Sequence, residues 1–340
     1  MIRNFEIDML DVKAADACLI RFASDVYNKN YVVLVDAGNY TDGKIITEFV
    51  KNRYGTQQID MAICTHCDKD HFGGFVWLLE QMNQKVRGAL TIKQMVIIDP
   101  AKYIKQEDVL NRIKGSTLYK RARSVYDLNG KNLLDMLDVM CNIRVVDPLK
   151  DWLGYPFANY FNIIGPSESY YREKNLGFRN DLESAPIYDD CDESEAYYTV
   201  NTTLSKTLDD ASDDSSSHNQ SSIIFTFVPD FTHKFLFMGD AGREAFENVC
   251  DKSFMENVYW LKVPHHGSKH NMDSTMIELI HPQVAYISTE KVGHYLSRAT
   301  VNALKKEGAT VCSTHNNHNL WFNESALNST RADYGPAICL

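Results

Sequence analysis

The chain has 340 residues, of which 44% are hydrophobic and 24% charged, and its formal net charge is −10 at pH 7. This length and composition fit a globular protein with one large domain or two ordinary ones, and they exclude a disordered chain. The net charge excludes a globally basic nucleic-acid-binding protein.

The acidic charge is concentrated in one segment. Residues 181–217 hold eleven acidic residues and one basic residue, which together equal the net charge of the whole chain. A solvated acidic loop is the simplest interpretation, and a lid that repels unwanted polyanions is the alternative. Residues 102–123 are rich in Lys and Arg instead, which suits the polar face of a helix or, alternatively, a strip that contacts phosphates.

The sequence carries no sign of secretion or of a membrane. Its N-terminus runs directly into a strand pattern without a signal peptide, and no apolar run approaches the length of a membrane span. The eight cysteines are irregularly spaced, which fits reduced thiols better than a disulfide framework. We therefore expect a cytoplasmic protein without membrane contact.

In chain order, the first half alternates strand and helix patterns. After a turn at Gly73-Gly74, the apolar spacing predicts a helix from Phe75 to Met82. Residues 100–160 have helical and irregular patterns. The remaining predicted elements of this half are a helix over 45–50 and strands over 7–12, 18–22, 31–38, 59–64, 95–99 and 161–166.

A second strand-rich half follows the acidic segment. The strands predicted over 223–228 and 234–238 are expected to be neighbours across a short turn. Because both halves follow the same plan, we expect two similar half-domains that pack as a sandwich with helices outside. The other predicted elements are strands over 260–263, 284–288 and 310–313 and helices over 244–250 and 299–307.

A dense cluster of potential metal ligands directly follows the strand predicted over 59–64. Side chains at the end of a strand project into the cleft at the edge of the sheet, and buried carboxylates are costly unless a cation neutralises them. A divalent metal does this best. The short segment points its side chains in more than one direction, so it can serve two metal sites. Its candidate ligands are His66, Asp68, Asp70 and His71.

The ligands still missing must come from elsewhere in the chain. Asp240 follows the strand predicted over 234–238, and His265 follows the strand predicted over 260–263. Both therefore end a strand, as the first cluster does.

Five short motifs resemble those of a known family. The run from Thr65 to Gly74 matches T-H-x-D-x-D-H-x-G-G, and the run from Leu10 to Ile20 matches L-D-V-G-Q-G-D-x-x-L-I with Lys-Ala-Ala in place of Gly-Gln-Gly. Gly239-Asp240, Pro264 to Ser268 and Gly293-His294 match its G-D, G-H-H-G-S and G-H elements. On these motifs the chain resembles the metallo-β-lactamase superfamily. It is most similar to the ComEC-like branch, typified by the hydrolase domain of DNA-uptake channel proteins.

The resemblance implies a fold and a domain plan. The fold would be the α/β metallo-β-lactamase sandwich, with αββα layers in two similar halves. It would form one domain over residues 1–323, with a helical and irregular insertion at about 100–217 that is acidic at 181–217. Residues 324–340 would form a C-terminal tail.

The same resemblance implies a centre of two divalent ions. His66 and Asp68 would hold one ion, Asp70, His71 and His265 the other, and Asp240 would bridge both. Asp36 would orient the ligand segment without touching an ion.

The first of these ion sites departs from the usual pattern. The third-motif histidine has no clear match, and Asn219, with His218 beside it, occupies the comparable region. Asp68 stands where a histidine is usual, and an oxygen-rich ligand set shifts the preference towards Mn²⁺ or Mg²⁺, with Zn²⁺ still a candidate.

The implied reaction is hydrolysis by a hydroxide that the two ions activate. Asp70 and His294 would be the catalytic residues, and His294 would donate a proton to the leaving group or grip a phosphate oxygen. His266, Ser268 and Asn219 would contact the substrate.

The leading functional prediction is a phosphodiesterase or nuclease that acts on DNA, RNA or a nucleotide. A hydrolase of a non-nucleotide ester, such as a phosphocholine or sulfate ester, is one alternative, because this fold hosts many reactions. A metal-stabilised binding module with little turnover, which meets a protein partner through residues 100–217, is the other.

Overall fold

The computed structural model describes residues 2–24, 26–104, 120, 122–178, 208–230, 232–290, 296–315 and 318–323. His294, most of the two segments of concentrated charge, and the predicted tail at 324–340 lie outside the described residues.

The first sheet, within the described part of the chain, has seven strands in the order β10-β7-β5-β3-β2-β1-β17. Strands β1, β2 and β3 pair antiparallel, whereas β3, β5, β7 and β10 pair parallel. These strands are β1 (Ile2–Met9), β2 (Cys18–Ser24), β3 (Lys29–Val35), β5 (Met61–Ile63), β7 (Gln94–Val96), β10 (Arg144–Val146) and β17 (Leu320–Asn323).

The second sheet has six described strands in sequence order, from β11 to β16. Strands β11 to β13 pair antiparallel and β13 to β16 pair parallel. The succession of pairings from β1 to β10 therefore matches that from β11 to β16, and the first sheet has β17 as an additional antiparallel strand. The strands are β11 (Phe161–Gly165), β12 (Ile224–Phe227), β13 (Phe235–Phe237), β14 (Trp260–Lys262), β15 (Val284–Ile287) and β16 (Thr310–Ser313). The expected pairing of the strands over 223–228 and 234–238 is confirmed by β12 and β13.

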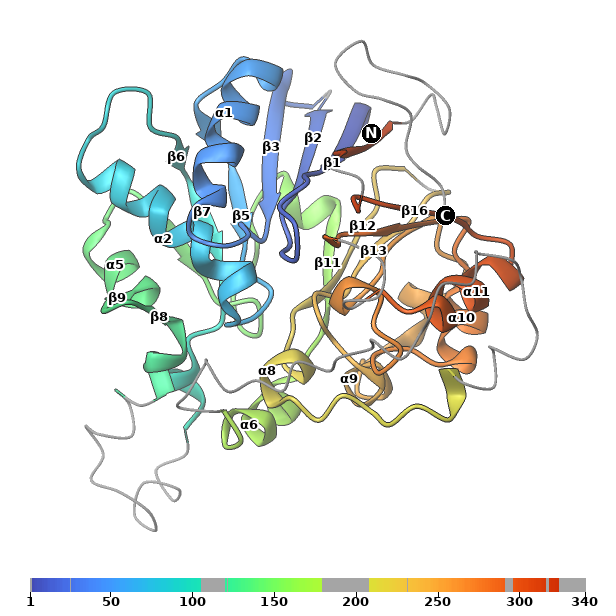
Figure 1. The fold of residues 1–340 in the computed structure, drawn as a ribbon. Coiled ribbons are helices and arrows are strands. Elements are labelled where there is room, and N and C mark those ends of the chain that lie inside the picture. Colours follow the sequence, from blue (N-terminus) through green and yellow to red (C-terminus); the bar gives the residue numbers. More distant parts are fainter. Residues whose placement is uncertain are drawn as a thin grey trace.

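Helices cover the outer faces of the sheets (Figure 1). Helices α1, α2 and α5 lie beside the first sheet, and α9, α10 and α11 lie beside the second. The helices are α1 (Asp42–Tyr54), α2 (Lys69–Asn83), α5 (Leu133–Val139), α6 (Glu168–Asn175), α8 (Ser217–Gln220), α9 (Arg243–Glu247), α10 (Ser274–Ile280) and α11 (Arg298–Lys306).

Smaller elements complete the described fold. Two short two-stranded ladders join β4 (Gln58–Ile59) to β6 (Thr91–Ile92) and β8 (Asp127–Leu128) to β9 (Lys131–Asn132). The single-turn helices are η1 (Pro100–Tyr103), η2 (Ser124–Tyr126), η3 (Phe157–Asn159), η5 (Lys252–Met255) and η6 (His265–Gly267).

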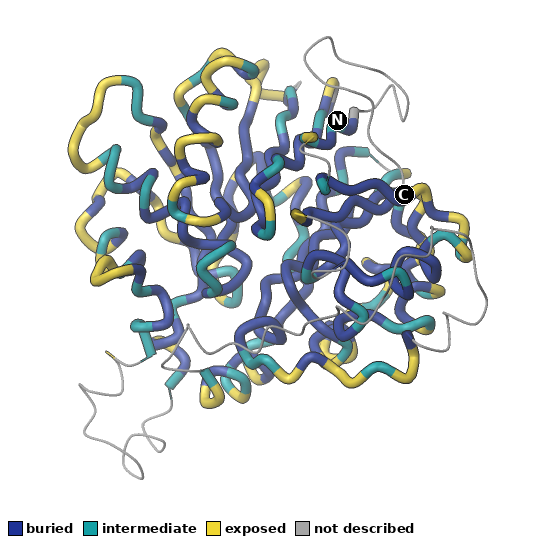
Figure 2. The backbone as a smooth tube through the Cα atoms, in the orientation of Figure 1, coloured by how far each residue is buried: buried dark blue, intermediate teal, exposed yellow. Residues whose placement is uncertain are grey.

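An apolar core joins the two sheets face to face. Phe5 of β1 lies 5.7 Å from Phe227 of β12, measured between ring centroids, and Phe22 of β2 lies 5.9 Å from the same ring. Figure 2 shows that buried residues dominate the strands, while exposed residues lie mainly on helices and loops. Burial of these apolar side chains is the main force that holds the two sheets together.

Helix α2 begins earlier than the sequence suggested. It starts at Lys69, so Asp70 and His71 lie in its first turn and Gly73-Gly74 lie inside it. The prediction of a turn at these glycines was wrong. A Cβ atom on Gly74 would lie 1.9 Å from the carbonyl oxygen of Ala37. The glycines therefore allow the helix to pack closely on the loop after β3.

Two edge strands of the first sheet were not predicted. Strand β10 lies within the predicted insertion and pairs with β7, and β17 pairs with β1. Both are short, at three and four residues, and such runs carry little periodicity. Part of the predicted insertion thus belongs to the sheet, while its boundaries stay a prediction.

None of the helices within the described residues has the length and apolar character needed to cross a membrane.

Candidate metal centre

The predicted ligands lie where the strands of both sheets end. The segment that starts at His66 follows β5 of the first sheet. Asp240 follows β13 of the second sheet, and His265 and His266 follow β14. The carboxyl ends of parallel strands share one edge of a sheet, so each sheet delivers its polar residues at one edge. The structure brings these two edges together.

At the middle of the cluster, two imidazole rings lie 4.1 Å apart, measured between the centroids of His66 and His71. Their Nε2 atoms are buried and make no hydrogen bond within the described residues. A buried polar atom without a partner is costly and calls for an explanation. Two such nitrogens that face carboxylates fit divalent cations.

Asp240 faces this pair of rings. Its Oδ2 lies 3.9 Å from Nε2 of His66, 3.2 Å from Nε2 of His71 and 4.0 Å from Nε2 of His265. Burial alone would raise the pKa of the Asp240 carboxyl, but the charges of His71 and His265 hold it well below its ordinary value. A single ionised oxygen that faces three imidazoles suits a bridging ligand, and the bridging role stays a prediction.

Asp68 and Asp70 border the open side of the cluster. Oδ2 of Asp68 lies 3.7 Å from Nε2 of His66, and Oδ2 of Asp70 lies 3.7 Å from Nε2 of His71. The two side chains are 22% and 31% exposed, whereas those of His66 and His71 are fully buried. A substrate would therefore approach from the side of Asp68 and Asp70.

His266 enters the cluster beside His265. Its Nε2 lies 3.3 Å from Oδ2 of Asp70, and its ring centroid lies 6.1 Å from that of His71. The sequence motifs predict His265 as the ligand and His266 as a substrate contact. The geometry makes both candidate ligands, because His266 is buried with Nε2 turned towards Asp70.

Each of the four candidate histidine ligands also has a protein contact at its other ring nitrogen, Nδ1. Such contacts fix the tautomer and the orientation of a histidine and turn its Nε2 towards an ion. The contacts are His66 to Oγ1 of Thr65 at 3.1 Å, His71 to Oδ2 of Asp36 at 2.9 Å, His265 to Oδ1 of Asn271 at 2.9 Å, and His266 to the carbonyl oxygen of Ser288 at 2.8 Å.

Asp36 has the surroundings expected of an orienting residue. Besides His71, its carboxylate accepts hydrogen bonds from the backbone N–H and from Oγ1 of Thr65, both at 2.8 Å. Its backbone φ is +54°, a strained conformation for a residue other than glycine. Strain of this kind persists where the surrounding contacts demand it.

Asp214 plays the corresponding part for His265 and was not singled out in the sequence. Its buried carboxylate lies 3.3 Å from Nδ1 of His265 and accepts hydrogen bonds from Nδ2 of Asn271 and Asn219. Together with Asp240 it raises the pKa of His265 to about 9, although burial opposes the shift. One acid among eleven in the acidic segment gave no signal of this role.

His218 also reaches the cluster. Its Nδ1 lies 2.9 Å from Oδ1 of Asp68, and Cys67, Asp68 and His218 form a group that could hold a metal ion. Burial lowers the pKa of His218, but the charge of Cys67 and the hydrogen bond to Asp68 raise it to about 10. The only signal in the sequence was its place beside Asn219.

The predicted roles of three further residues, Asn219, Ser268 and His294, are not tested by the structure. Nδ2 of Asn219 is bonded to Asp214, 2.6 Å away. Oγ of the buried Ser268 accepts a hydrogen bond from the backbone N–H of His270. The substrate contacts predicted for Asn219 and Ser268 stay predictions. His294 lies outside the described residues.

The comparisons with known proteins agree with the ligand pattern of the first sheet. Residues 16–111 match the family model described as the metallo-beta-lactamase superfamily. A comparison with curated proteins finds no match. The superfamily consists mostly of hydrolases that bind divalent metals, and the described residues contain three groups that could hold such an ion. A metal-dependent hydrolase is the class of function that the match supports.

Proposed function

We propose that this protein is a metal-dependent phosphodiesterase, which acts on DNA, RNA or a nucleotide. The observation that carries the proposal is the pair of buried Nε2 atoms without hydrogen bonds that face Oδ2 of Asp240. The cluster is also rich in carboxylates, and oxygen ligands favour the hard ions Mn²⁺ and Mg²⁺, with Zn²⁺ a further candidate.

Two divalent ions would fit the residues at hand. His66, Asp68 and Asp240 would hold one ion, and Asp70, His71 and Asp240 would hold the other. His265 or His266 would complete the second set. When bound, such ions supply Lewis acidity and lower the pKa of water.

The residues of the chain have distinct tasks in this proposal. Asp70 is ionised, because His71 and His266 offset the effect of burial and hold its pKa below the ordinary value. Its exposed carboxylate can accept a hydrogen bond from the attacking water. His294 would protonate the leaving-group oxygen, and His266, Ser268 and Asn219 would orient the substrate. Asp36 and Asp214 hold the rings of His71 and His265 in place.

We further propose the finer assignments that the motifs suggest. The chain would belong to the ComEC-like branch and adopt the αββα sandwich of two similar halves. In both sheets two antiparallel strand pairs are followed by three parallel pairs, from β1 to β10 and from β11 to β16, and this likeness supports the fold. One domain would span residues 1–323, with an insertion at about 100–217 that could meet a protein partner, and a tail at 324–340. A cytoplasmic location remains part of the proposal.

A substrate panel tests the activity. Protein loaded with Mn²⁺, and separately with Zn²⁺, is assayed on bis-p-nitrophenyl phosphate and then on single-stranded DNA, duplex DNA, RNA and cyclic dinucleotides. We expect metal-dependent turnover that Asp240→Asn abolishes. Turnover only of phosphocholine or sulfate esters would favour the non-nucleotide hydrolase. Absence of turnover on every ester by fully loaded protein would contradict the proposal and favour the binding module.

A further inference from the structure

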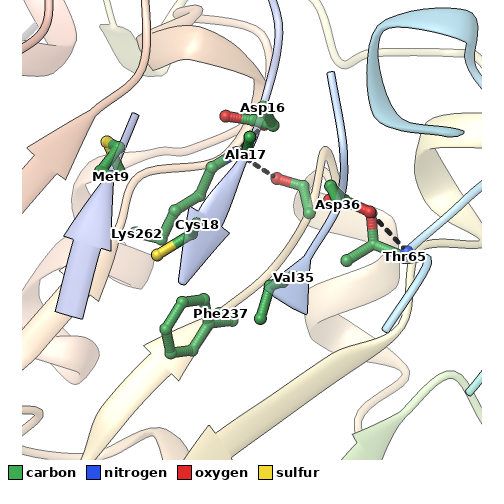
Figure 3. Close-up of a pocket in the computed structure, with 10 residues that line it drawn as sticks. Met9, Asp16, Ala17, Cys18, Val35, Asp36, Thr65, Phe237 and Lys262 are labelled. Atoms are coloured by element: carbon green, nitrogen blue, oxygen red, sulfur yellow. Dashed lines mark hydrogen bonds and ion pairs between the residues drawn. The ribbon is translucent and has the colours of Figure 1, made fainter. Parts of the chain in front are cut away.

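A buried lysine stands next to the candidate metal centre. Lys262, the last residue of β14, is 5% exposed. Its Nζ contacts Oδ2 of Asp16, lies 3.2 Å from the carbonyl oxygen of Gly239 and lies 3.7 Å from Oδ1 of Asp240. All three partners are acceptors. Figure 3 shows the lysine side chain extended past Cys18 towards Asp16.

The backbone fixes both ends of this ion pair. Strand β13 pairs with β14 so that Phe237 lies opposite Lys262, which brings the lysine beside the turn that carries Asp240. On the other side, the N–H of Asp16 donates to the carbonyl oxygen of Asp70, and the carbonyl oxygen of Asp16 accepts from the N–H of Gly38. Neither partner can move far without disturbing the ligand segment.

Asp16 is itself placed as a potential metal ligand. Its Oδ2 lies 3.6 Å from Nε2 of His71, and Asp16, His71 and His266 form one of the groups that could hold an ion. The same oxygen is already in contact with the ammonium group of Lys262. The lysine and an ion would therefore compete for it.

Charge balance favours the lysine in this competition. Five carboxylates lie within 4.0 Å of a ring nitrogen of His66 or His71. Two divalent ions would bring four positive charges to these five carboxylates, and the ammonium group of Lys262, in contact with Asp16, supplies a further one. An uncompensated charge in such a buried place would be strongly unfavourable.

The space around the pair admits no other cation with its water shell. Asp16 and Lys262 line a cavity together with Asp36, Thr65 and Gly239, and its volume of about 10 Å³ is at the lower limit for one water molecule. The ammonium group is the cation for which this part of the site has room.

We propose that Lys262 supplies a permanent positive charge at the metal centre. Through its ion pair with Asp16, it keeps the carboxylate of Asp16 from coordinating the ions. Its Nζ also lies 3.7 Å from Oδ1 of Asp240, which accepts a hydrogen bond from the backbone N–H of His265 at 3.2 Å, so that Oδ2 of Asp240 would face the ions. Lys262 is thus a positioning residue, which sets the number of oxygen ligands. The inference rests on the proposed metal centre and needs no particular substrate.

Cobalt substitution tests the inference, because the visible absorption of bound Co²⁺ weakens as its coordination number rises. Wild type, Lys262→Met, Asp16→Asn and the double variant are titrated with Co²⁺. In Lys262→Met, Asp16 becomes free to bind an ion, so we expect weaker absorption and affinity raised by about tenfold or more, since a nearby positive charge is lost. In the double variant the wild-type spectrum returns.

Asp16→Asn alone supplies the decisive control. We expect it to keep the wild-type spectrum and the same number of bound ions, because Asp16 is not a ligand while Lys262 is present. A changed spectrum or a lost ion would make Asp16 a ligand and overturn the inference. This variant also keeps the test valid if Lys262→Met does not fold.

A second lysine of the same sheet serves as a control for the general loss of one positive charge. Lys234 directly precedes β13, and its Nζ donates to the carbonyl oxygen of Ser253. Lys234→Met should leave the spectrum and affinity unchanged. Equal affinities and spectra in Lys262→Met and wild type would overturn the inference. A protein that binds ions as expected but hydrolyses no phosphodiester would contradict only the proposed function.

Discussion

The two sheets contribute to the candidate metal centre in different ways. The first sheet supplies a compact segment, in which His66, Asp68, Asp70 and His71 lie within six residues. The second sheet supplies Asp240, His265 and His266 from two separate strand ends. Each contribution depends on residues far away in the chain, such as Asp36 for His71 and Asp214 for His265. The compact candidate ligands are recognisable in the sequence. Of the residues that hold them, Asp36 was predicted from its resemblance to a motif, whereas Asp214 is recognisable only in the fold.

The largest expected effect is on the number of bound ions, which should differ between substitutions in the two sheets. Asp240→Ala should lose most of both ions, because its Oδ2 faces His66, His71 and His265 together. Asp68→Ala should lose only the ion on its own side. Metal analysis of the purified variants measures this, against about two ions per chain in the parent for a dinuclear site. An Asp240→Ala protein that stays fully loaded would remove the bridging role.

A smaller effect is expected when the holding residues are removed. Asp36→Ala and Asp214→Ala should each weaken metal binding by about 10–100-fold, the usual cost of losing a partner of a metal-bound histidine. Competition with a coloured chelator measures the affinity. Asp60→Asn is the control, because Asp60 is buried but bonds to Lys29 and the N–H of Val32, away from the cluster. An equal loss in the control would point to general destabilisation.

Removal of the ions should lower the melting temperature, Tm, by several degrees. The proposed ions would neutralise buried carboxylates of both sheets, and any ligand that binds only the native state adds stability by mass action. We expect EDTA to lower Tm and an excess of Mn²⁺ or Zn²⁺ to restore it. A melt that stays the same after verified removal of the metal would contradict this expectation.

A separate effect is expected on the pH dependence of the metal-free protein. The pKa of His265 is raised to about 9 and that of His218 to about 10. A raised histidine pKa stabilises the fold at a pH below the unfolded value of about 6.5, and this stability is lost as the pH rises through the folded value. The urea midpoint of metal-free protein should therefore fall between about pH 6.5 and pH 9.

The metal-loaded protein should respond to pH in the opposite direction. Protons compete with ions for histidine and carboxylate ligands, so metal binding, and with it stability, weakens as the pH falls. Urea midpoints of the two forms, measured over the same pH series, should converge at low pH. Parallel curves would show that the raised pKa values of the histidines are not linked to metal binding.

The sequence was informative where chemistry is local. The segment of candidate ligands could be predicted because four residues of two ligand types, His and Asp, follow one buried strand. Most strands could be predicted from short apolar runs. The start of α2 could not, because Gly73-Gly74 is typical of a turn, and only the close approach of Ala37 explains the glycines within a helix.

Residues that act across the fold gave no such signal. Asp16 and Lys262 are separated by 246 positions and meet only because the two sheets, packed face to face, bring their strand ends together at the site. Asp214 was one acid among many. Nothing in a single sequence distinguishes such residues from ordinary charged residues, since their role depends on which strand ends become neighbours.

The pairing of β1 with β17 has a consequence for how the protein is made. Glu6 lies opposite Asn323 in this ladder, so β1 leaves the ribosome long before its partner β17 is made. Until then the outer edge of β1 is an unpaired strand edge, which other chains can join. Folding that depends on such distant partners is slow. We therefore expect assembly of the first sheet to finish only once β17 has been made, with the nascent chain in need of protection against aggregation until then.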